Sequence, residues 1–213
     1  MKNIIAAILI AAPLLSFSQL GIKAGINFAN VTKTSDINNS SRSGFHGGVF
    51  MAPASKGVMG FRTELLFSQQ GYNYESGTNT GNVNLNYIVF PQYMTINITK
   101  VFQIQFGGQF AFLINAKADS SNNTGSGTNP YGELMDYYNT FDYGYGGGIE
   151  VHPIKGLLVG ARFNISLSKL YKDMGTSSPG TPPSFIPDVD VKNNLFQVFA
   201  GWTFGNSSKT RSQ

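Results

Sequence analysis

Hydrophobic and polar residues alternate one by one along most of this chain. The alternation is clearest in 101–115, where every second position carries a bulky apolar residue or glycine, namely Phe102, Ile104, Phe106, Gly108, Phe110, Phe112 and Ile114. Gln103, Gln105 and Gln109 are among the residues between them. Because successive side chains of a β-strand point to opposite faces, this period of two predicts a strand with one apolar face.

The same pattern recurs in six further segments, 22–28, 45–51, 61–68, 141–151, 159–167 and 196–204. An eighth segment, 83–98, carries apolar residues on both faces and has Pro91 in its middle. Since proline cannot donate a hydrogen bond to a neighbouring strand, we expect a bulge or a change of register there.

The connections between these segments alternate in length. Tight turns lie at 53–57, 97–100 and 153–156, and long polar connections lie at 32–42, 75–82, 119–139 and 171–191. Barrels of the bacterial outer membrane have short turns on the periplasmic side and long loops outside. We therefore predict an all-β fold, a single antiparallel up-and-down transmembrane β-barrel of about eight strands.

Alternation alone also fits a soluble ligand-binding barrel whose apolar face points inward. Charged residues, however, make up only 12% of the chain, and the polar face holds mostly Gly, Gln, Asn and Ser. Such a face suits a crowded interior better than a surface in water, so we favour the membrane barrel. We expect six aromatic residues near strand ends to lie at the lipid interface, Tyr72, Tyr74, Tyr143, Tyr145, Tyr171 and Trp202.

The start of the chain has the pattern of a secretory signal. Lys2 gives a positive beginning, 4–15 is almost entirely apolar, and Ser16 and Ser18 are small residues at the positions that a signal peptidase inspects. We predict a signal peptide at 1–18, an outer-membrane barrel at 19–205 and a polar periplasmic tail at 206–213. The chain has no cysteine, which excludes a disulfide framework and a lipid-anchored cysteine.

These hairpins resemble the porin-family, PorT-like outer-membrane β-barrel domains of Gram-negative bacteria. The resemblance covers nearly all of the mature chain and rests on Leu20-Gly-Ile-Lys-Ala-Gly-Ile-Asn-Phe-Ala, Gly44-Phe-His-Gly-Gly-Val-Phe, Phe61-Arg-Thr-Glu-Leu-Leu-Phe-Ser-Gln-Gln-Gly-Tyr, the strand around Pro91, Gly146-Gly-Gly-Ile-Glu-Val and Phe199-Ala-Gly-Trp-Thr-Phe. Two features depart from it: Val89 stands where many relatives carry an acidic residue, and a polar tail follows the last strand. The resemblance implies fold and location but little chemistry. It also implies a link to protein secretion or gliding for some relatives.

The polar face of the predicted barrel collects charges of both signs, Lys23, His46, Arg62, Glu64, Glu150 and Arg162. A lone buried charge is costly, so we interpret these residues as a structural ion and hydrogen-bond network that fills the interior. The alternative is a gate, in which rearranged Arg and Glu side chains open a narrow path for ions or small solutes. An eight-stranded barrel has little room for free diffusion.

Nothing in the sequence favours catalysis or a bound cofactor. The chain has only two histidines, His46 and His152, which is few for a catalytic or metal site. No calcium-loop motif occurs among the acidic residues, and the glycine run at Gly146 lacks phosphate-loop spacing. The net charge of +4 is not concentrated in a run, so nucleic acid is not an expected partner. We expect no enzyme, no metal and no cofactor.

The external loops are the best candidates for function. The loops 119–139 and 171–191 contain aromatic residues, Tyr131, Tyr137 and Tyr138, of a kind that often contacts partners. We expect a structural or loop-mediated recognition role, with outer-membrane lipid and the barrel-assembly machinery as partners. A further extracellular or secretion-system protein partner is an open alternative.

Overall fold

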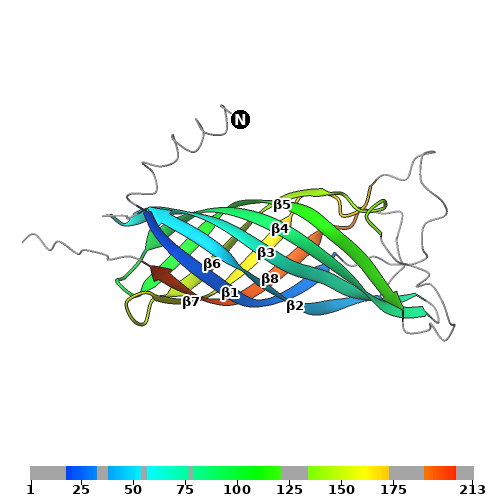
Figure 1. Cartoon of the computed structure of the whole chain (residues 1–213), viewed down its shortest axis with the longest axis horizontal. Coiled ribbons are helices and arrows are strands. Elements are labelled where there is room, and N and C mark those ends of the chain that lie inside the picture. The colour runs from blue at the N-terminus through cyan, green and yellow to red at the C-terminus, as the bar shows by residue number, and fades with distance from the viewer. Residues whose placement is uncertain are drawn as a thin grey trace, which may run out of the picture.

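The computed structural model describes residues 18–32, 38–53, 57–76, 79–120, 134–172 and 190–204. They form a closed barrel in which each strand pairs antiparallel with the next and the last pairs with the first (Figure 1). This confirms the predicted fold of eight up-and-down strands. The strands are β1 Ser18–Val31, β2 Asn38–Pro53, β3 Met59–Ser76, β4 Asn79–Asn97, β5 Phe102–Ser120, β6 Phe141–Val151, β7 Leu157–Ser166 and β8 Asn193–Phe204.

The two ends of the barrel differ. β1 begins and β8 ends at one end, on the left in Figure 1, together with the connections β2–β3, β4–β5 and β6–β7. We call this the turn end and the opposite one the loop end. The expectation of a long loop at 75–82 is wrong, because β3 and β4 continue to Ser76 and Asn79 and pair there. Buried Tyr74 and Val83 extend the alternation, which keeps the two strands together.

Pro91 does not cause the expected change of register. On the β3 side the pairing is interrupted between Thr63–Gln92 and Leu66–Val89, since proline has no N–H, but it resumes in the same register. The shift in this region lies between β4 and β5, at Asn86 and Tyr87, where β5 has Ile114 as an extra residue. Such a bulge changes which residues face inward beyond it. The buried positions of β5 accordingly change from odd to even numbers after Leu113.

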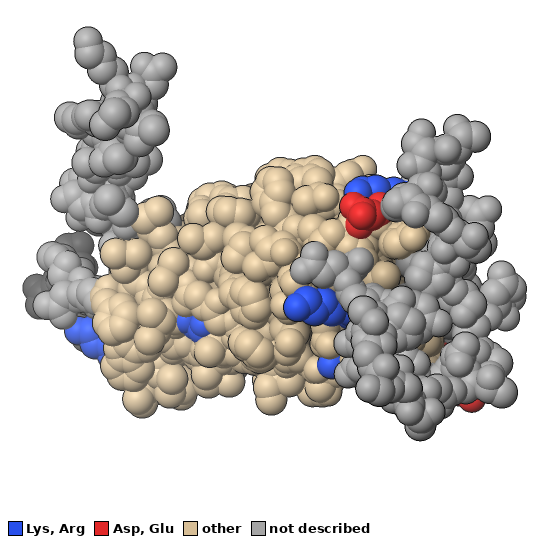
Figure 2. Space-filling model, turned by 45° about the vertical axis from the view of Figure 1, so that its right-hand side comes forward, with Lys and Arg blue, Asp and Glu red and all other residues tan. Residues whose placement is uncertain are grey.

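The outer wall of the barrel is apolar. Large hydrophobic side chains such as Ile26 and Phe45 are more than half exposed. The residues that alternate with such side chains along each strand face the interior of the barrel. On the face drawn in Figure 2, few charged side chains appear on the barrel wall, most of them toward the loop end. A large exposed apolar surface is unfavourable in water and favourable against lipid. The apolar face predicted from the sequence is therefore the outer, lipid-facing wall of the barrel.

Residues 1–17 and 205–213 lie outside the described part of the chain, and with them most of the expected signal peptide and the polar tail. Ser18, the last residue of the expected signal, begins β1 and pairs with Pro53. Within the described ranges, no helix is long and apolar enough to cross a membrane.

Candidate functional site

The interior of the barrel near the turn end is centred on Glu64. Its carboxylate accepts hydrogen bonds from Lys23 Nζ on β1, at 2.7 and 2.9 Å, and from both terminal nitrogens of Arg162 on β7, at 2.8 and 2.9 Å. β1, β3 and β7 thus send their side chains to one point on the barrel axis. The Arg162 contact is bidentate, which is the strongest geometry available to an arginine and a carboxylate.

A second carboxylate, Glu150 on β6, continues this arrangement toward the turn end. It pairs with Arg62 and accepts a hydrogen bond from Gln105 Nε2 at 3.2 Å. Gln105 Oε1 in turn accepts from Arg162 at 2.6 Å, which joins the two carboxylates into one network. His152 Nε2 lies 3.5 Å from the other oxygen of Glu150.

Aromatic rings complete the surroundings of the cations. Lys23 Nζ lies 3.9 Å from the centre of the Phe199 ring, and the Arg162 guanidinium lies 4.0 Å from the centre of the Tyr93 ring. Tyr93 donates a hydrogen bond of 2.5 Å to Asn164. Gly146 leaves the room for this contact, since a Cβ there would lie 2.1 Å from Asn164 Oδ1. The structural reason for a glycine at this position is therefore close packing across the barrel.

We call Lys23, Arg62, Glu64, Glu150 and Arg162 the ion network. All five residues are nine-tenths or more buried, and their charges are three positive and two negative. A buried ion is stable only when it is paired and hydrogen-bonded, which the bonds above provide. The network joins side chains from β1, β3, β6 and β7 inside the barrel.

His46, the sixth residue predicted for this group, lies outside the ion network. Its Nδ1 is 2.8 Å from Asn27 Oδ1 in an adjacent amide layer. Asn27 also donates to Ser68 Oγ at 3.0 Å, and Gln197 donates to Asn27 at 2.9 Å. The structure therefore brings five of the six predicted residues together and places the histidine in the amide layer beside them.

The interior near the loop end is filled differently. The segments 134–140 and 167–172 fold across this part of the barrel and are joined by a bridge between Tyr138 and Tyr171. The hydroxyl of Tyr72 on β3 lies 2.7 Å from that of Tyr138 and 2.6 Å from that of Tyr171. We call these two segments the cap. The cap contributes Leu134 and Leu170 to a buried apolar cluster, to which the strands contribute Val31, Leu85, Tyr87 and Leu113.

Several aromatic predictions are wrong for this reason. Tyr72, Tyr74 and Tyr171 were expected at the lipid interface but are buried inside the barrel, because strand parity and the cap place them inward. Tyr138, expected to be free for recognition, is also buried, and Tyr137 is half-buried. The other residues expected at the lipid interface, Tyr143, Tyr145 and Trp202, are exposed on the outer wall. The other residue expected to act in recognition, Tyr131, lies outside the described residues.

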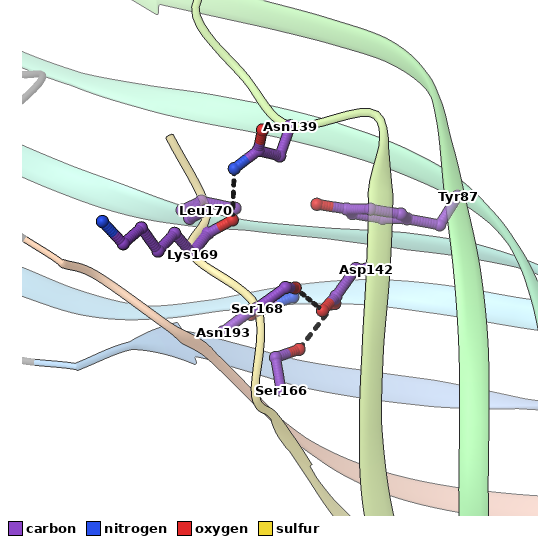
Figure 3. Close-up of a pocket in the computed structure, with 8 residues that line it drawn as sticks. All are labelled: Tyr87, Asn139, Asp142, Ser166, Ser168, Lys169, Leu170 and Asn193. Atoms are coloured by element: carbon purple, nitrogen blue, oxygen red, sulfur yellow. Dashed lines mark hydrogen bonds between the residues drawn. The ribbon is translucent and has the colours of Figure 1, made fainter. Parts of the chain in front are cut away.

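One polar site was not singled out from the sequence. A narrow crevice, partly open to solvent, lies between the cap and the ends of β6, β7 and β8 (Figure 3). Asp142 Oδ2 accepts from Ser166 Oγ at 2.6 Å, and Oδ1 accepts from Ser168. In the sequence, Asp142 lies on the polar face of 141–151. A single acidic residue on that face is the only sequence signal that could have indicated this site.

A ring of antiparallel strands with an apolar outer wall and a packed polar interior is the construction of a transmembrane β-barrel of the outer membrane. A family model described as "Outer membrane protein beta-barrel domain" matches residues 12–172, most of the chain. The chain belongs to this family, which supports a location in the outer membrane. No curated protein matches the sequence.

Solved structures with a similar fold include Ail, the attachment invasion locus protein of Yersinia pestis. In complex with the heparin analogue sucrose octasulfate, Ail is 16% identical to this chain with a TM-score of 0.50, and the match covers 88% of this chain and 99% of Ail. Neisserial surface protein A is 12% identical with a TM-score of 0.48, over 87% of this chain and 97% of its own. At such identities the likeness concerns the fold alone. The family and the apolar outer wall argue against the soluble barrel considered from the sequence.

Proposed function

We propose that this protein is a closed, non-enzymatic outer-membrane barrel that acts by recognition at its loop end. The observation that carries the proposal is the ion network, whose paired side chains are nine-tenths or more buried inside the barrel. Within the described ranges, no group of three or more His, Cys, Asp or Glu side chains is placed to hold a metal. The function is therefore sought outside the interior.

The two segments that flank the cap in the sequence have a chemistry of their own. The segments 121–133 and 173–189 contain Glu133, Asp173 and Asp188 but no Lys or Arg, and they are rich in Ser, Thr, Asn, Gly and Pro. They also contain Tyr131 and Phe185, aromatic residues that suit contact with a sugar ring or a protein surface. Their negative charge opposes an anionic partner. A neutral glycan or a protein is the partner that fits this composition.

Loop replacement tests the proposal. Segments 121–133 and 173–189 are each replaced by a short Gly-Ser linker, which leaves the cap in place, and the control carries both loops with their residues scrambled. Cells that display each barrel are tested on a glycan array and on extracellular matrix proteins, with heparin included as an anionic probe. We expect binding to neutral glycans or protein by the natural barrel only. Equal binding by all three barrels, or by none, contradicts recognition through these loops.

The alternative is a narrow gated channel, and the excess of one positive charge in the ion network would make it prefer anions. Planar bilayer recording distinguishes the two functions. We expect the natural barrel to be silent over a range of voltages. Reproducible single-channel steps with anion preference would support conduction instead.

A role as an accessory of protein secretion is a further hypothesis, drawn from the resemblance to PorT-like barrels. Deletion of the gene with measurement of the secreted proteins tests it. Normal secretion in the deletion strain would exclude the role.

A further inference from the structure

Two polar side chains form a pair on the apolar outer wall of the barrel. Thr63 on β3 and Gln92 on β4 are register partners, and Thr63 Oγ1 lies 2.9 Å from Gln92 Oε1. The residues on either side of each of them in the sequence are buried in the interior. Because side chains alternate along a strand, Thr63 and Gln92 face outward, toward lipid.

The pair lies in the middle of the apolar span of its two strands. On β3 the outward positions of 59–67 are apolar except Thr63, and on β4 those of 88–96 are apolar except Gln92. Each residue is at the centre of its span. A strand crosses the hydrocarbon with about 9–11 residues, so the pair lies near the mid-plane of the membrane. The other outward-facing amides of the described strands lie toward the loop end, beyond these spans.

One end of the Gln92 amide has no partner. A side-chain amide has an oxygen that accepts and an NH₂ group that donates, and the bond to Thr63 uses only one of them. Turning the amide over exchanges the two groups and still leaves one unused. Gln92 forms no other side-chain hydrogen bond with the residues that the structure describes. Since hydrocarbon holds no water to supply the missing bond, the unused group is costly at this depth.

The wall beside this amide is open. Gly108 on β5 is the register partner of Gln92 and is exposed. The nearest atom to a Cβ placed there would be the carbonyl oxygen of Gly144, at 3.6 Å, which is an ordinary contact. The packing of the barrel itself therefore does not require a glycine at this position. Its effect is a shallow notch beside Gln92, and small residues of this kind let two membrane proteins approach closely.

We propose that two copies of this barrel associate through this wall, with the Gln92 amides of the two copies bonded to each other. Both copies enter the membrane in the same direction, so a two-fold axis along the membrane normal places the second Gln92 at the depth of the first. Each amide both donates and accepts, which makes the contact self-complementary. A lipid chain offers neither group. The dimer is independent of the recognition proposed for the loops, because none of its residues lies in 121–133 or 173–189.

Disulfide cross-linking tests which wall is in contact. The chain has no cysteine, so a single introduced cysteine reports on its own position. Met94→Cys lies two residues from Gln92 on the same outward face, and Val198→Cys, equally exposed on β8 across the barrel, is the matched control. Outer membranes that contain either barrel are treated with a membrane-permeant oxidant. We expect a linked dimer from Met94→Cys only. Equal yields from both, or a link from Met94→Cys to a different protein alone, would overturn the proposal.

Two substitutions test the cause of the association. Gln92→Leu removes the amide and keeps the wall apolar, and Gly108→Leu fills the notch. Energy transfer between labelled barrels in lipid vesicles, measured at increasing lipid-to-protein ratios, gives the strength of association. We expect Gln92→Leu to weaken it by roughly tenfold. We expect Gly108→Leu to abolish it and the control Val198→Leu to leave it unchanged.

Heat-modifiable gel migration checks that each variant is folded. If Gly108→Leu does not fold, Gln92→Leu carries the test, because it leaves the apolar wall and the interior intact. A folded Gln92→Leu barrel that associates as tightly as the natural one would overturn the proposal. So would a natural barrel that is monomeric at every ratio.

Discussion

The two halves of the barrel interior are filled by different means. Near the turn end, side chains of the strands themselves meet on the axis and hold one another through charge. Near the loop end, the strands leave space that the cap fills with apolar and tyrosine side chains from outside the sheet. The first half is held by ion pairs between strand residues, whereas the second depends on two added segments that attach through an apolar cluster and hydrogen bonds. A loss of charge should therefore affect the whole barrel, and a loss in the cap should act locally.

The largest effect is expected from Glu64→Ala. The substitution leaves Lys23 and Arg162 buried without their shared carboxylate, which costs about 3–5 kcal/mol of unfolding free energy. Urea unfolding followed by the fluorescence of the single tryptophan, Trp202, measures it. Glu75→Ala is the matched control, an exposed glutamate on the same strand, and should unfold like the natural barrel. Equal midpoints for both variants would mean that the ion network does not hold the barrel together.

The next largest effect is expected from alkaline pH, which should destabilise the cap. Burial raises the pKa of Tyr171 to about 12, while an unfolded tyrosine ionises near its ordinary pKa of 10.0. A raised pKa contributes stability that is complete below about pH 10 and is lost as the pH rises to about 12, by roughly 1.4 kcal/mol for each unit. The tyrosinate absorbance of the natural barrel minus that of the Tyr171→Phe barrel gives the titration of Tyr171, which we expect near pH 12. Titration near pH 10 would mean that the cap is open in solution.

A smaller and local effect is expected from Tyr72→Phe. The change removes the hydroxyl that contacts both Tyr138 and Tyr171, at a cost of about 1–2 kcal/mol. Hydrogen exchange should become faster in 134–140 and 167–172 and stay unchanged in the strands near the ion network. Tyr145→Phe, on the outer wall, serves as the control. Faster exchange throughout the barrel would show that the two halves are not independent.

The smallest effect is expected from deletion of Ile114, the extra residue of the β5 bulge. Removing it leaves Leu113 and Ala116 facing inward, so the apolar cluster is retained. We expect a folded barrel by heat-modifiable migration with a stability change below about 1 kcal/mol. Deletion of Phe106 is the contrasting control, because it reverses the faces of Gln109 and Ala111 and should prevent folding. Failure of both deletions would assign the bulge an essential role.

The barrel and its ion network could be predicted because both follow from strand parity. Lys23, Glu64 and Arg162 share the polar parity of their strands, and a closed barrel brings that parity to a common axis. The cap could not be predicted, since its position depends on contacts between Tyr72, Tyr138 and Tyr171 far apart in sequence. The tyrosine expectation failed because it relied on aromatic character near strand ends: Tyr72 and Tyr74 share the inward parity of Arg62 and Glu64 on β3, and Tyr171 lies in the cap, where no strand parity applies.

The pairing of β1 with β8 has a consequence for how the protein is made. This seam joins residues at the two ends of the barrel sequence, from Leu20–Phe204 to Val31–Asn193, so it cannot form until the last strand has been synthesised and exported. Until then both edge strands expose unpaired backbone groups, a template for aggregation. Closure is thus the slow and vulnerable step of biogenesis, and a factor that shields one of these two edges would protect the chain most effectively.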